Sequence, residues 1–285
     1  MVAVDRGPAG QAVSGDRFYK MTGSGNDFVF LDGREHDLTA WPPERIRAVC
    51  DRRRGVGGDG VVHLGLEPDG AVRMVYFNSD GSHADLCGNA ALCSARLAVQ
   101  LALARSERIE LATDAGRLEC RCVGPGWMAE LKFPTAQVPS PVELALAGGE
   151  RRAFHGTVGV PHAILLVDDI EAVDVARRGR ALRFDPVFGP AGSNINFMGR
   201  ESGSDAEWAL RTYERGVEGE TLACGTGTVA AALAVAGAGL AKFPIRIRSR
   251  SGLVFSLTAS LEGGIATDVW LCGEGRLVFE GRLAE

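Results

Sequence analysis

Two short stretches, Asp85–Ala91 (DLCGNAA) and Leu222–Thr228 (LACGTGT), decide the fold that this sequence predicts. Each places Cys-Gly and then Asn or Thr directly before a long apolar run. Runs of this length that are apolar on nearly every side are typical of buried helices rather than strands. We therefore predict two buried helices, with Cys87 and Cys224 at or just before their N-termini.

The similarity between the two stretches extends upstream in the same order. The matched landmarks are a Gly-containing turn before an apolar run and an aspartate (23–32 and 159–168), a Gly-rich turn (55–60 and 189–194), and a strand-like run with aromatic residues (72–77 and 208–213). An ordered set of matches indicates a duplicated α/β unit. Asn89 and Thr226 have the side chains that commonly cap helices, so we expect them to be the capping residues.

The predicted fold is α/β (α+β), with two pseudo-symmetric lobes. Each lobe is a mixed β-sheet rolled around a central helix, and the active site lies in the cleft between them. We expect 1–16 to be a disordered N-terminus, 17–133 to form the N-terminal lobe and 134–274 the C-terminal lobe, with 275–285 returning to the first. Prolines cluster at the predicted boundary, at Pro134, Pro139 and Pro141.

The bulk composition excludes several classes of protein. The chain has 285 residues, 46% of them hydrophobic, and a formal net charge of -5. An acidic chain is a poor electrostatic partner for nucleic acid or an anionic membrane, so we expect neither as a partner. No run has signal-peptide character, and the apolar run after Cys224 is short for a membrane span. We expect a cytoplasmic protein.

The cysteines predict reactive or buried thiols rather than crosslinks or metal ligands. Their number, 7, is odd, no Cys-x-x-Cys pair occurs, and the five histidines do not cluster near them. We therefore expect neither a disulfide scaffold nor a metal site. Five cysteines are expected to be small buried residues: Cys50, Cys93, Cys120, Cys122 and Cys272.

Cysteines at two helix N-termini suit the inversion of a stereocentre. The unpaired N–H groups of a helix start carry partial positive charge, bind anions and are expected to lower the pKa of a nearby thiol. If two such starts face one α-carbon, one sulfur removes the α-proton and the other delivers a proton to the opposite face. This chemistry needs no cofactor. A single Cys beside Gly is more often inert, but the repeat favours catalysis for Cys87 and Cys224.

The sequence resembles the diaminopimelate epimerase family from about Phe18 to Phe279. The segments that carry the resemblance are Met21–Val29 (MTGSGNDFV), Phe77–Gly81 (FNSDG) before Leu86–Ala90 (LCGNA), and Tyr213–Gly216 (YERG) before Glu220–Gly227 (ETLACGTG). The resemblance implies an isomerase without pyridoxal phosphate that interconverts LL- and meso-diaminopimelate for lysine and peptidoglycan precursors. It also implies that Cys87 and Cys224 are the catalytic acid/base pair. We further expect a homodimer.

The resemblance further implies roles for other residues. His162 and Glu214 would tune the pKa values of the two thiols. The residues that would bind substrate are Asn26, Asn78, Gly88, Asn89, Asn194, Glu214, Arg215, Gly225 and Thr226.

Simpler interpretations remain for these residues at this point. The three asparagines Asn26, Asn78 and Asn194 also fit turns. Glu214 and Arg215 also fit an exposed ion pair, and His162 fits a structural histidine.

Three departures from the family pattern leave the substrate open. Some members have Gln where this chain has Gly60, and the family often has Asn where it has Val160. The spacing before Cys224 is also one residue longer than in many members, at Glu218. A racemase of another amino acid is therefore an alternative. A thiol redox or amino-acid-binding protein is an alternative from another class.

Overall fold

The computed structural model describes residues 15–201 and 206–283. Most of the predicted disordered segment, residues 1–14, lies outside the described residues. Asp16, which that prediction included, forms an ion pair with Arg45, and its carbonyl accepts a hydrogen bond from the Leu283 amide at 2.9 Å.

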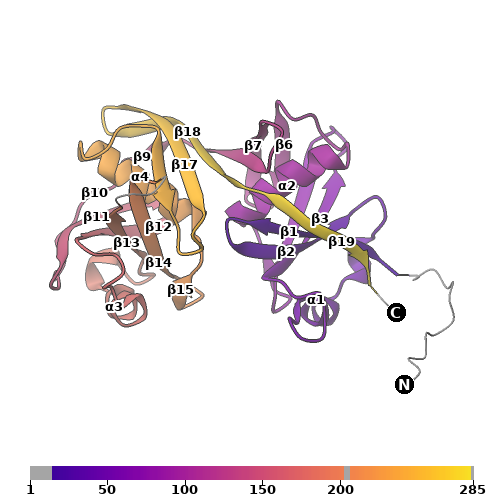
Figure 1. The fold of residues 1–285 in the computed structure, drawn as a ribbon, viewed down its shortest axis with the longest axis horizontal. Coiled ribbons are helices and arrows are strands. Elements are labelled where there is room, and N and C mark those ends of the chain that lie inside the picture. The colour runs from indigo at the N-terminus through magenta and orange to yellow at the C-terminus, as the bar shows by residue number, and fades with distance from the viewer. Residues whose placement is uncertain (1–14, 202–205, 284–285) are drawn as a thin grey trace, which may run out of the picture.

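The first half of the chain forms a mixed sheet around one helix (Figure 1). Its elements are β1 (Arg17–Gly23), β2 (Asn26–Asp32), η1 (Leu38–Ala40), α1 (Pro43–Cys50), β3 (Gly60–Leu66), β4 (Val72–Asn78), β5 (His83–Ala84), α2 (Gly88–Gln100), β6 (Ile109–Thr113), β7 (Gly116–Val123) and β8 (Met128–Phe133). The β2–β3 and β4–β6 pairs are parallel, and the β1–β2, β3–β4, β6–β7 and β7–β8 pairs are antiparallel.

The second half repeats this arrangement. Its elements are β11 (Glu150–Val158), β12 (Val160–Val167), α3 (Val175–Leu182), η2 (Pro186–Phe188), β13 (Asn194–Arg200), β14 (Trp208–Glu214), β15 (Gly219–Thr221), α4 (Gly225–Gly237), β16 (Ile245–Arg248), β17 (Val254–Glu262) and β18 (Ile265–Glu274). The β12–β13 and β14–β16 pairs are parallel, and β11–β12, β13–β14, β16–β17 and β17–β18 are antiparallel. The matching order of pairs confirms the predicted pair of pseudo-symmetric lobes.

The two halves are joined by strand pairing. β8 pairs antiparallel with β18, where the buried Leu131 and Leu271 lie opposite each other. The short strands β9 (Ala136–Gln137) and β10 (Ser140–Pro141) pair with β18 and β11. The last strand, β19 (Arg276–Arg282), crosses to the first half and pairs with β1 (Figure 1). The lobe limits at residues 133 and 274 stay a prediction, because β8 and β18 share one sheet.

The helices α2 and α4 form the centres of the two lobes. Residues 229–235 of α4 are all fully enclosed, and in α2 Leu92 and Leu97 have 1% and 0% exposure. Burying such a leucine is worth about 1.5–3 kcal/mol, which compensates for the weak helix propensity of the glycines at both helix starts.

The helix starts differ from the predicted capping. The N-cap residues are Cys87 and Cys224 themselves, and neither side chain caps the helix by a hydrogen bond. Asn89 and Thr226 lie within the first turns instead, so the prediction that they are the caps was wrong. Their side chains make other contacts: Asn89 Nδ2 donates to Asn26 Oδ1, and Thr226 Oγ1 lies 3.6 Å from Sγ of Cys224.

No helix within the described parts of the chain is both long and apolar enough to cross a membrane.

Candidate active site

Cys87 lies at the start of α2, where the backbone holds its sulfur. The backbone N–H groups of Asn89 and Ala90 lower the pKa of the Cys87 thiol and so favour the thiolate. Burial has the larger, opposite effect and raises the pKa of the Cys87 thiol to about 11. The free enzyme therefore holds Cys87 as a neutral thiol at neutral pH.

Cys224 lies in the equivalent position at the start of α4. Its sulfur is 3.6 Å from Oγ1 of Thr226, and the backbone N–H of Gly227 lowers the pKa of its thiol. The residue is 8% exposed, and burial raises the pKa of its thiol to about 12. The sequence predicted that helix N-termini would lower the pKa of both thiols. That prediction was wrong, because desolvation outweighs the first-turn N–H groups.

The two cysteines lie within electrostatic range of each other. A charge on Cys87 raises the pKa of Cys224, and the carboxylate of Glu214 raises the pKa of both thiols. The helices α2 and α4 also contact each other. The structure thus brings together two thiols and one acidic side chain that lie far apart in the sequence.

A loop contact holds the two halves together beside these thiols. Gly25, in the turn between β1 and β2, has a φ of +104°, and a Cβ there would lie 2.3 Å from Cβ of Ser251. The Ser251 amide in turn donates to the carbonyl of Leu222, two residues before Cys224. This close approach accounts for the glycine and places the first-half turn against the segment that leads to Cys224.

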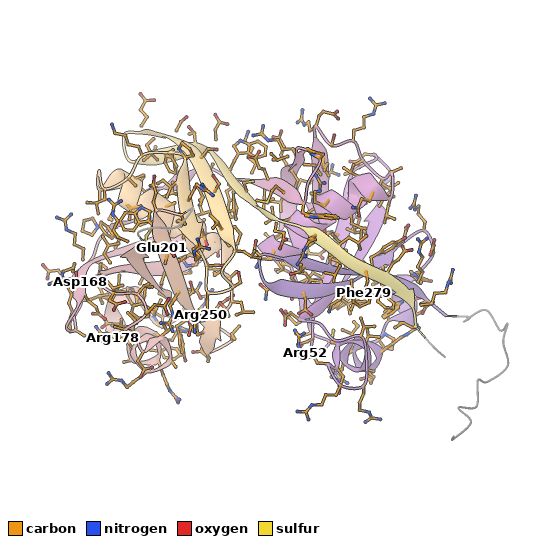
Figure 2. All side chains as sticks on the ribbon, in the orientation of Figure 1. Arg52, Asp168, Arg178, Glu201, Arg250 and Phe279 are labelled. Atoms are coloured by element: carbon orange, nitrogen blue, oxygen red, sulfur yellow. The ribbon has the colours of Figure 1, made fainter. Side chains whose placement is uncertain are left out.

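A chain of hydrogen bonds supports the start of α2. Asn26 Nδ2 donates to Asp59 Oδ2 at 2.9 Å, and Asn26 Oδ1 accepts from Asn89 Nδ2 at 2.6 Å. Arg52, labelled in Figure 2, donates to Asp59 Oδ1 at 2.7 Å and also binds Asp27. Because the Asp59 carboxylate can only accept, the Asn26 atom that contacts it is Nδ2. Asn26 Oδ1 then has to accept from Nδ2 of Asn89, so the side-chain amide orientations of Asn26 and Asn89 are both determined. Asn89 Oδ1 is left fully enclosed and without a partner among the described residues.

A neutral network lies behind the start of α4. Asn196 Nδ2 donates to the Ala163 carbonyl at 2.9 Å and contacts His162 Nδ1 at 3.2 Å, while Thr212 Oγ1 donates to Asn196 Oδ1 at 2.9 Å. The Ala163 carbonyl can only accept, so the Asn196 atom that contacts it is the amide nitrogen, which is a donor. The same nitrogen contacts Nδ1 of His162, so Nδ1 is the acceptor and Nε2 carries the proton. Nε2 is enclosed and has no partner among the described residues. Burial lowers the pKa of His162 to about 3, so the ring is neutral.

Asn196 is a residue that the sequence analysis missed. Its side chain is 0% exposed and lies beside α4, since a Cβ on Gly227 would be 2.4 Å from its Oδ1 and 3.2 Å from Sγ of Cys224. The sequence did contain one indication of its role: Asn196 lies two residues after Asn194, so both side chains are on the same face of the strand. An amide inside an apolar strand has to have a partner, which could have marked it.

Asn194, Glu214 and Arg215 meet at the ends of β13 and β14. Asn194 Oδ1 accepts a hydrogen bond from the Arg215 amide at 2.6 Å. Glu214 and Arg215 are half-buried, and no ion pair of either side chain is found among the described residues. Burial raises the pKa of Glu214 more than a hydrogen bond with the Thr221 side chain lowers it. The exposed-ion-pair interpretation is therefore wrong. An acidic and a basic side chain are left unpaired, as a zwitterionic ligand would require.

The remaining predicted residues lie at the same edges. Asn78 ends β4, and its Nδ2 donates to Ser82 Oγ at 3.0 Å within a turn. Gly88 and Gly225 are the first residues of α2 and α4. A Cβ on Gly88 would meet no atom within 4 Å, so space lies open beside that helix start.

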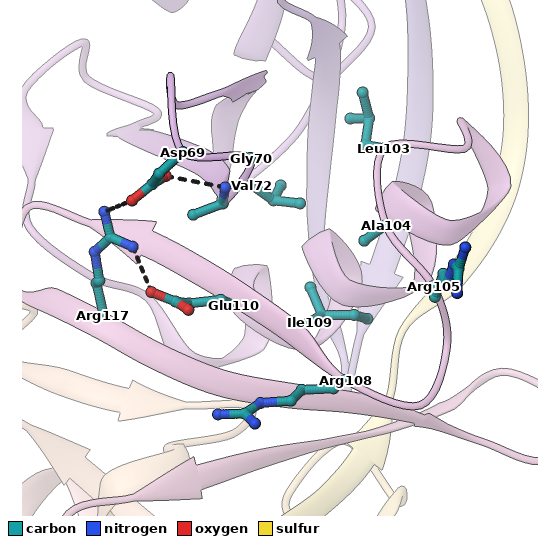
Figure 3. Close-up of a pocket in the computed structure, with 11 residues that line it drawn as sticks. Asp69, Gly70, Val72, Leu103, Ala104, Arg105, Arg108, Ile109, Glu110 and Arg117 are labelled. Atoms are coloured by element: carbon teal, nitrogen blue, oxygen red, sulfur yellow. Dashed lines mark hydrogen bonds and ion pairs between the residues drawn. The ribbon is translucent and has the colours of Figure 1, made fainter.

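A surface hollow elsewhere is unrelated to the cysteines. It has a volume of about 380 Å³, and in its lining Arg117 forms ion pairs with Asp69 and Glu110 (Figure 3). None of the predicted site residues lines it. In the described ranges, no group of three or more His, Cys, Asp or Glu side chains is placed to hold a metal ion.

Comparisons with solved structures support the fold. A phenazine biosynthesis protein of the PhzF family from Enterococcus faecalis superposes with a TM-score of 0.71 at 17% identity, covering 95% of this chain and 100% of that one. A hydroxyproline epimerase from Agrobacterium vitis, with bound trans-4-hydroxy-L-proline, gives a TM-score of 0.66 at 15% identity, covering 94% and 92%. At these identities the likeness shows a shared fold.

Sequence relatives are much closer. The family profile described as "Diaminopimelate epimerase" matches residues 18–130 and 154–263. The diaminopimelate epimerase of Gemmatimonas aurantiaca is 44% identical over 279 residues, covering 94% of this chain and 99% of that protein. The enzyme of Aquifex aeolicus is 37% identical, covering 94% and 98%. With its paired helix-start cysteines and these relatives, the chain belongs to the diaminopimelate epimerase family.

Proposed function

We propose that this chain interconverts LL- and meso-diaminopimelate by proton transfer between Cys87 and Cys224. The observation that carries the proposal is the pair of N-cap thiols within electrostatic range of each other, one from each lobe of a family member. This activity would serve lysine and peptidoglycan precursor synthesis. The enzyme class is an amino-acid epimerase, an isomerase.

In the proposed mechanism, one sulfur acts as a thiolate and removes the α-proton. The other acts as a thiol and donates its proton to the opposite face, which inverts the centre. The C–H electron pair moves onto the α-carboxylate, and the sulfurs exchange roles in the reverse reaction. Donors placed in advance where charge develops give the largest stabilisation, and the first-turn amides of Gly88, Asn89, Gly225 and Thr226 are such donors.

Forming the thiolate requires the substrate. Burial and Glu214 raise the pKa of both thiols in the free enzyme, so the neutral forms dominate. The ammonium group of a bound amino acid would neutralise Glu214 and so remove one of the charges that oppose ionisation. We propose that substrate binding in this way prepares one sulfur for proton abstraction.

The polar residues around the thiols supply the recognition that we propose. Arg215 would pair with a substrate carboxylate and Glu214 with an ammonium. Asn26, Asn78 and Asn194 would bind the other polar groups. In the free enzyme each amide is held by a neighbour, Asp59, Ser82 or the Arg215 amide. His162 would contribute to the thiol pKa values through its unpartnered Nε2–H.

A racemase of another amino acid remains the second candidate because of Gly60 and Val160. Val160 begins β12, and a Cβ on the adjacent Gly159 would lie 3.6 Å from Thr226 Cγ2. The departure from Asn therefore lies next to the start of α4, where it would change substrate contacts. The third candidate, a thiol redox or binding protein, predicts no α-proton exchange with any amino acid.

The deciding experiment is α-proton exchange in D₂O, followed by mass spectrometry. The enzyme is incubated with LL- and meso-diaminopimelate and with a panel of other amino acids. We expect deuterium incorporation and epimerisation with diaminopimelate only. Exchange with another amino acid alone would support the second candidate, and no exchange with any would overturn the two-thiol proposal.

Two further expectations stay predictions. Light scattering after size-exclusion chromatography would test for a homodimer. Fractionation of the producing cells would test the cytoplasmic location.

A further inference from the structure

Gly60, a departure from the family pattern, leaves room for the ring of a neighbouring tyrosine. A Cβ on Gly60 would lie 2.6 Å from Cε2 and 3.0 Å from the hydroxyl oxygen of Tyr76, and 2.4 Å from the Phe77 carbonyl oxygen. Real Cβ atoms essentially never make such contacts. The start of β3 therefore has to be glycine for the Tyr76 ring to lie where it does.

The Tyr76 ring is fixed in this position by its surroundings. It packs edge-on against Phe28, with ring centroids 6.0 Å apart and an interplanar angle of 84°. Tyr76 and Asn78 are two residues apart on β4 and so point to the same face of the sheet. Gly60 pairs with Asn78 across the strands and directly follows Asp59, which holds Asn26. The ring thus lies among residues that the proposed site uses.

The Tyr76 hydroxyl is available to a ligand. The residue is 7% exposed, and within residues 15–201 and 206–283 no hydrogen bond of its hydroxyl is found. The hydroxyl oxygen is not among the fully enclosed polar atoms that lack a partner in the described chain. It therefore remains in contact with solvent-accessible space. Cys87 and Asp59 from its own half and Glu214 from the other half all raise the pKa of the phenol, after burial. The hydroxyl therefore stays protonated and lies within electrostatic range of groups from both halves of the site.

We propose that Tyr76 is a substrate-binding residue of this enzyme, whose hydroxyl donates a hydrogen bond to a carboxylate oxygen of the bound amino acid. The hydroxyl lies beside Gly60, which has no side chain that could donate such a bond. The departure at Gly60 then marks a different donor at the same place rather than a lost contact. This inference rests on the proposed function.

The test removes only the hydroxyl. In Tyr76→Phe the ring still fills the space above Gly60, so the thermal unfolding midpoint should stay close to that of the wild type. A hydrogen bond to a charged group is worth about 1.5–3 kcal/mol, so we expect kcat/KM for diaminopimelate to fall about 10- to 100-fold, mainly through KM. Tyr19→Phe is the matched control. Tyr19 is 4% exposed in the same half, but its charged neighbours are Arg17, Glu35, Asp32 and Glu280. It should keep wild-type kinetics within about twofold.

A binding measurement separates recognition from chemistry. In the Cys87→Ser background, calorimetry with LL-diaminopimelate should show about tenfold weaker binding when Tyr76→Phe is added. Unchanged binding together with kcat/KM within twofold of wild type would overturn the inference. So would a change confined to the pH dependence of Cys87 alkylation, because the hydroxyl would then act on sulfur instead. If wild-type enzyme itself exchanged no α-proton, the proposed function would fail, which is a separate result.

Discussion

The starts of α2 and α4 share one backbone frame but differ in what supports them. In the first half, a charged chain runs from the exposed Arg52 through Asp59 and Asn26 to Asn89. In the second half, the supporting network of His162, Asn196 and Thr212 is uncharged and buried. The duplication therefore preserved the position of the sulfur and let its surroundings diverge.

This difference leaves opposite functional groups unpartnered. Asn89 Oδ1 is an enclosed acceptor in the first half, and His162 Nε2–H is an enclosed donor in the second. A substrate amino acid carries both an ammonium group and a carboxylate. Two unlike half-sites can orient such a molecule in one way, which two identical half-sites could not do.

The largest expected effect comes from the sulfurs, where the two halves should behave alike. Cys87→Ser and Cys224→Ser should each lower epimerisation by about 10³-fold, because general acid–base groups contribute 10²- to 10⁴-fold. Circular dichroism should show an unchanged fold. Cys122→Ser and Cys272→Ser, one in each half, are the controls and should stay active. Near-wild-type turnover in either catalytic variant would remove the two-base assignment.

The second largest effect is expected at the third residue of each helix, where substitutions should have different costs in the two halves. Gly227→Ala forces a Cβ within 2.4 Å of Asn196 Oδ1, so we expect a loss of about 1–3 kcal/mol in unfolding free energy and reduced turnover. At the equivalent place α2 carries Ala90, and Ala90→Gly should cost only about 0.5–1 kcal/mol. Urea unfolding of both variants makes the comparison. Equal losses would show that Asn196 does not restrict the start of α4.

We expect a residue of the second half, His162, to contribute to the loss of unfolding free energy at low pH. His162 has a pKa lowered to about 3 in the folded state against 6.5 in the unfolded chain, so only the unfolded chain takes up its proton between these values. Its contribution to stability is present above pH 6.5 and is lost as the pH falls toward 3. His162→Gln should therefore show a smaller loss of unfolding free energy between pH 7 and pH 5, by about 1–2 kcal/mol. His63→Gln in the first half reports the cost of the substitution itself. An acid profile identical to wild type would contradict the buried neutral ring.

The smallest expected effect distinguishes the charges around the two thiols. Asp59 raises the pKa of Cys87, whereas Glu214 raises the pKa of both cysteines. Asp59→Asn should therefore shift iodoacetamide labelling of Cys87 to lower pH and leave Cys224 nearly unchanged. Glu214→Gln should shift both. Residue-resolved mass spectrometry after labelling at a series of pH values makes the measurement. Equal shifts of both thiols in Asp59→Asn would refute the asymmetry.

Much of the architecture followed from local patterns. The apolar runs after Cys87 and Cys224 became α2 and α4, and the aromatic runs at 72–77 and 208–213 became β4 and β14. The repeated order of turns and strands predicted two lobes, because hydrophobic periodicity is a local property of the chain. The resemblance pointed to Asn26, Asn194, Glu214 and Arg215, which the fold places at strand ends beside the two helix starts.

Other features depend on which residues meet in space, and only the tertiary structure decided them. Burial, which no local pattern reports, reversed the expected direction of both thiol pKa shifts. Asn196 lies inside an apolar strand, and its hydrogen-bond partners come from two other strands of the second half, β12 and β14. Gly60 is only a departure from the family pattern in the sequence, and the fold places the Tyr76 ring against it. The sequence by itself determined the duplicated frame and its two cysteines. Desolvation and side-chain contacts between distant segments determined how each cysteine is held, because both depend on the whole packed chain.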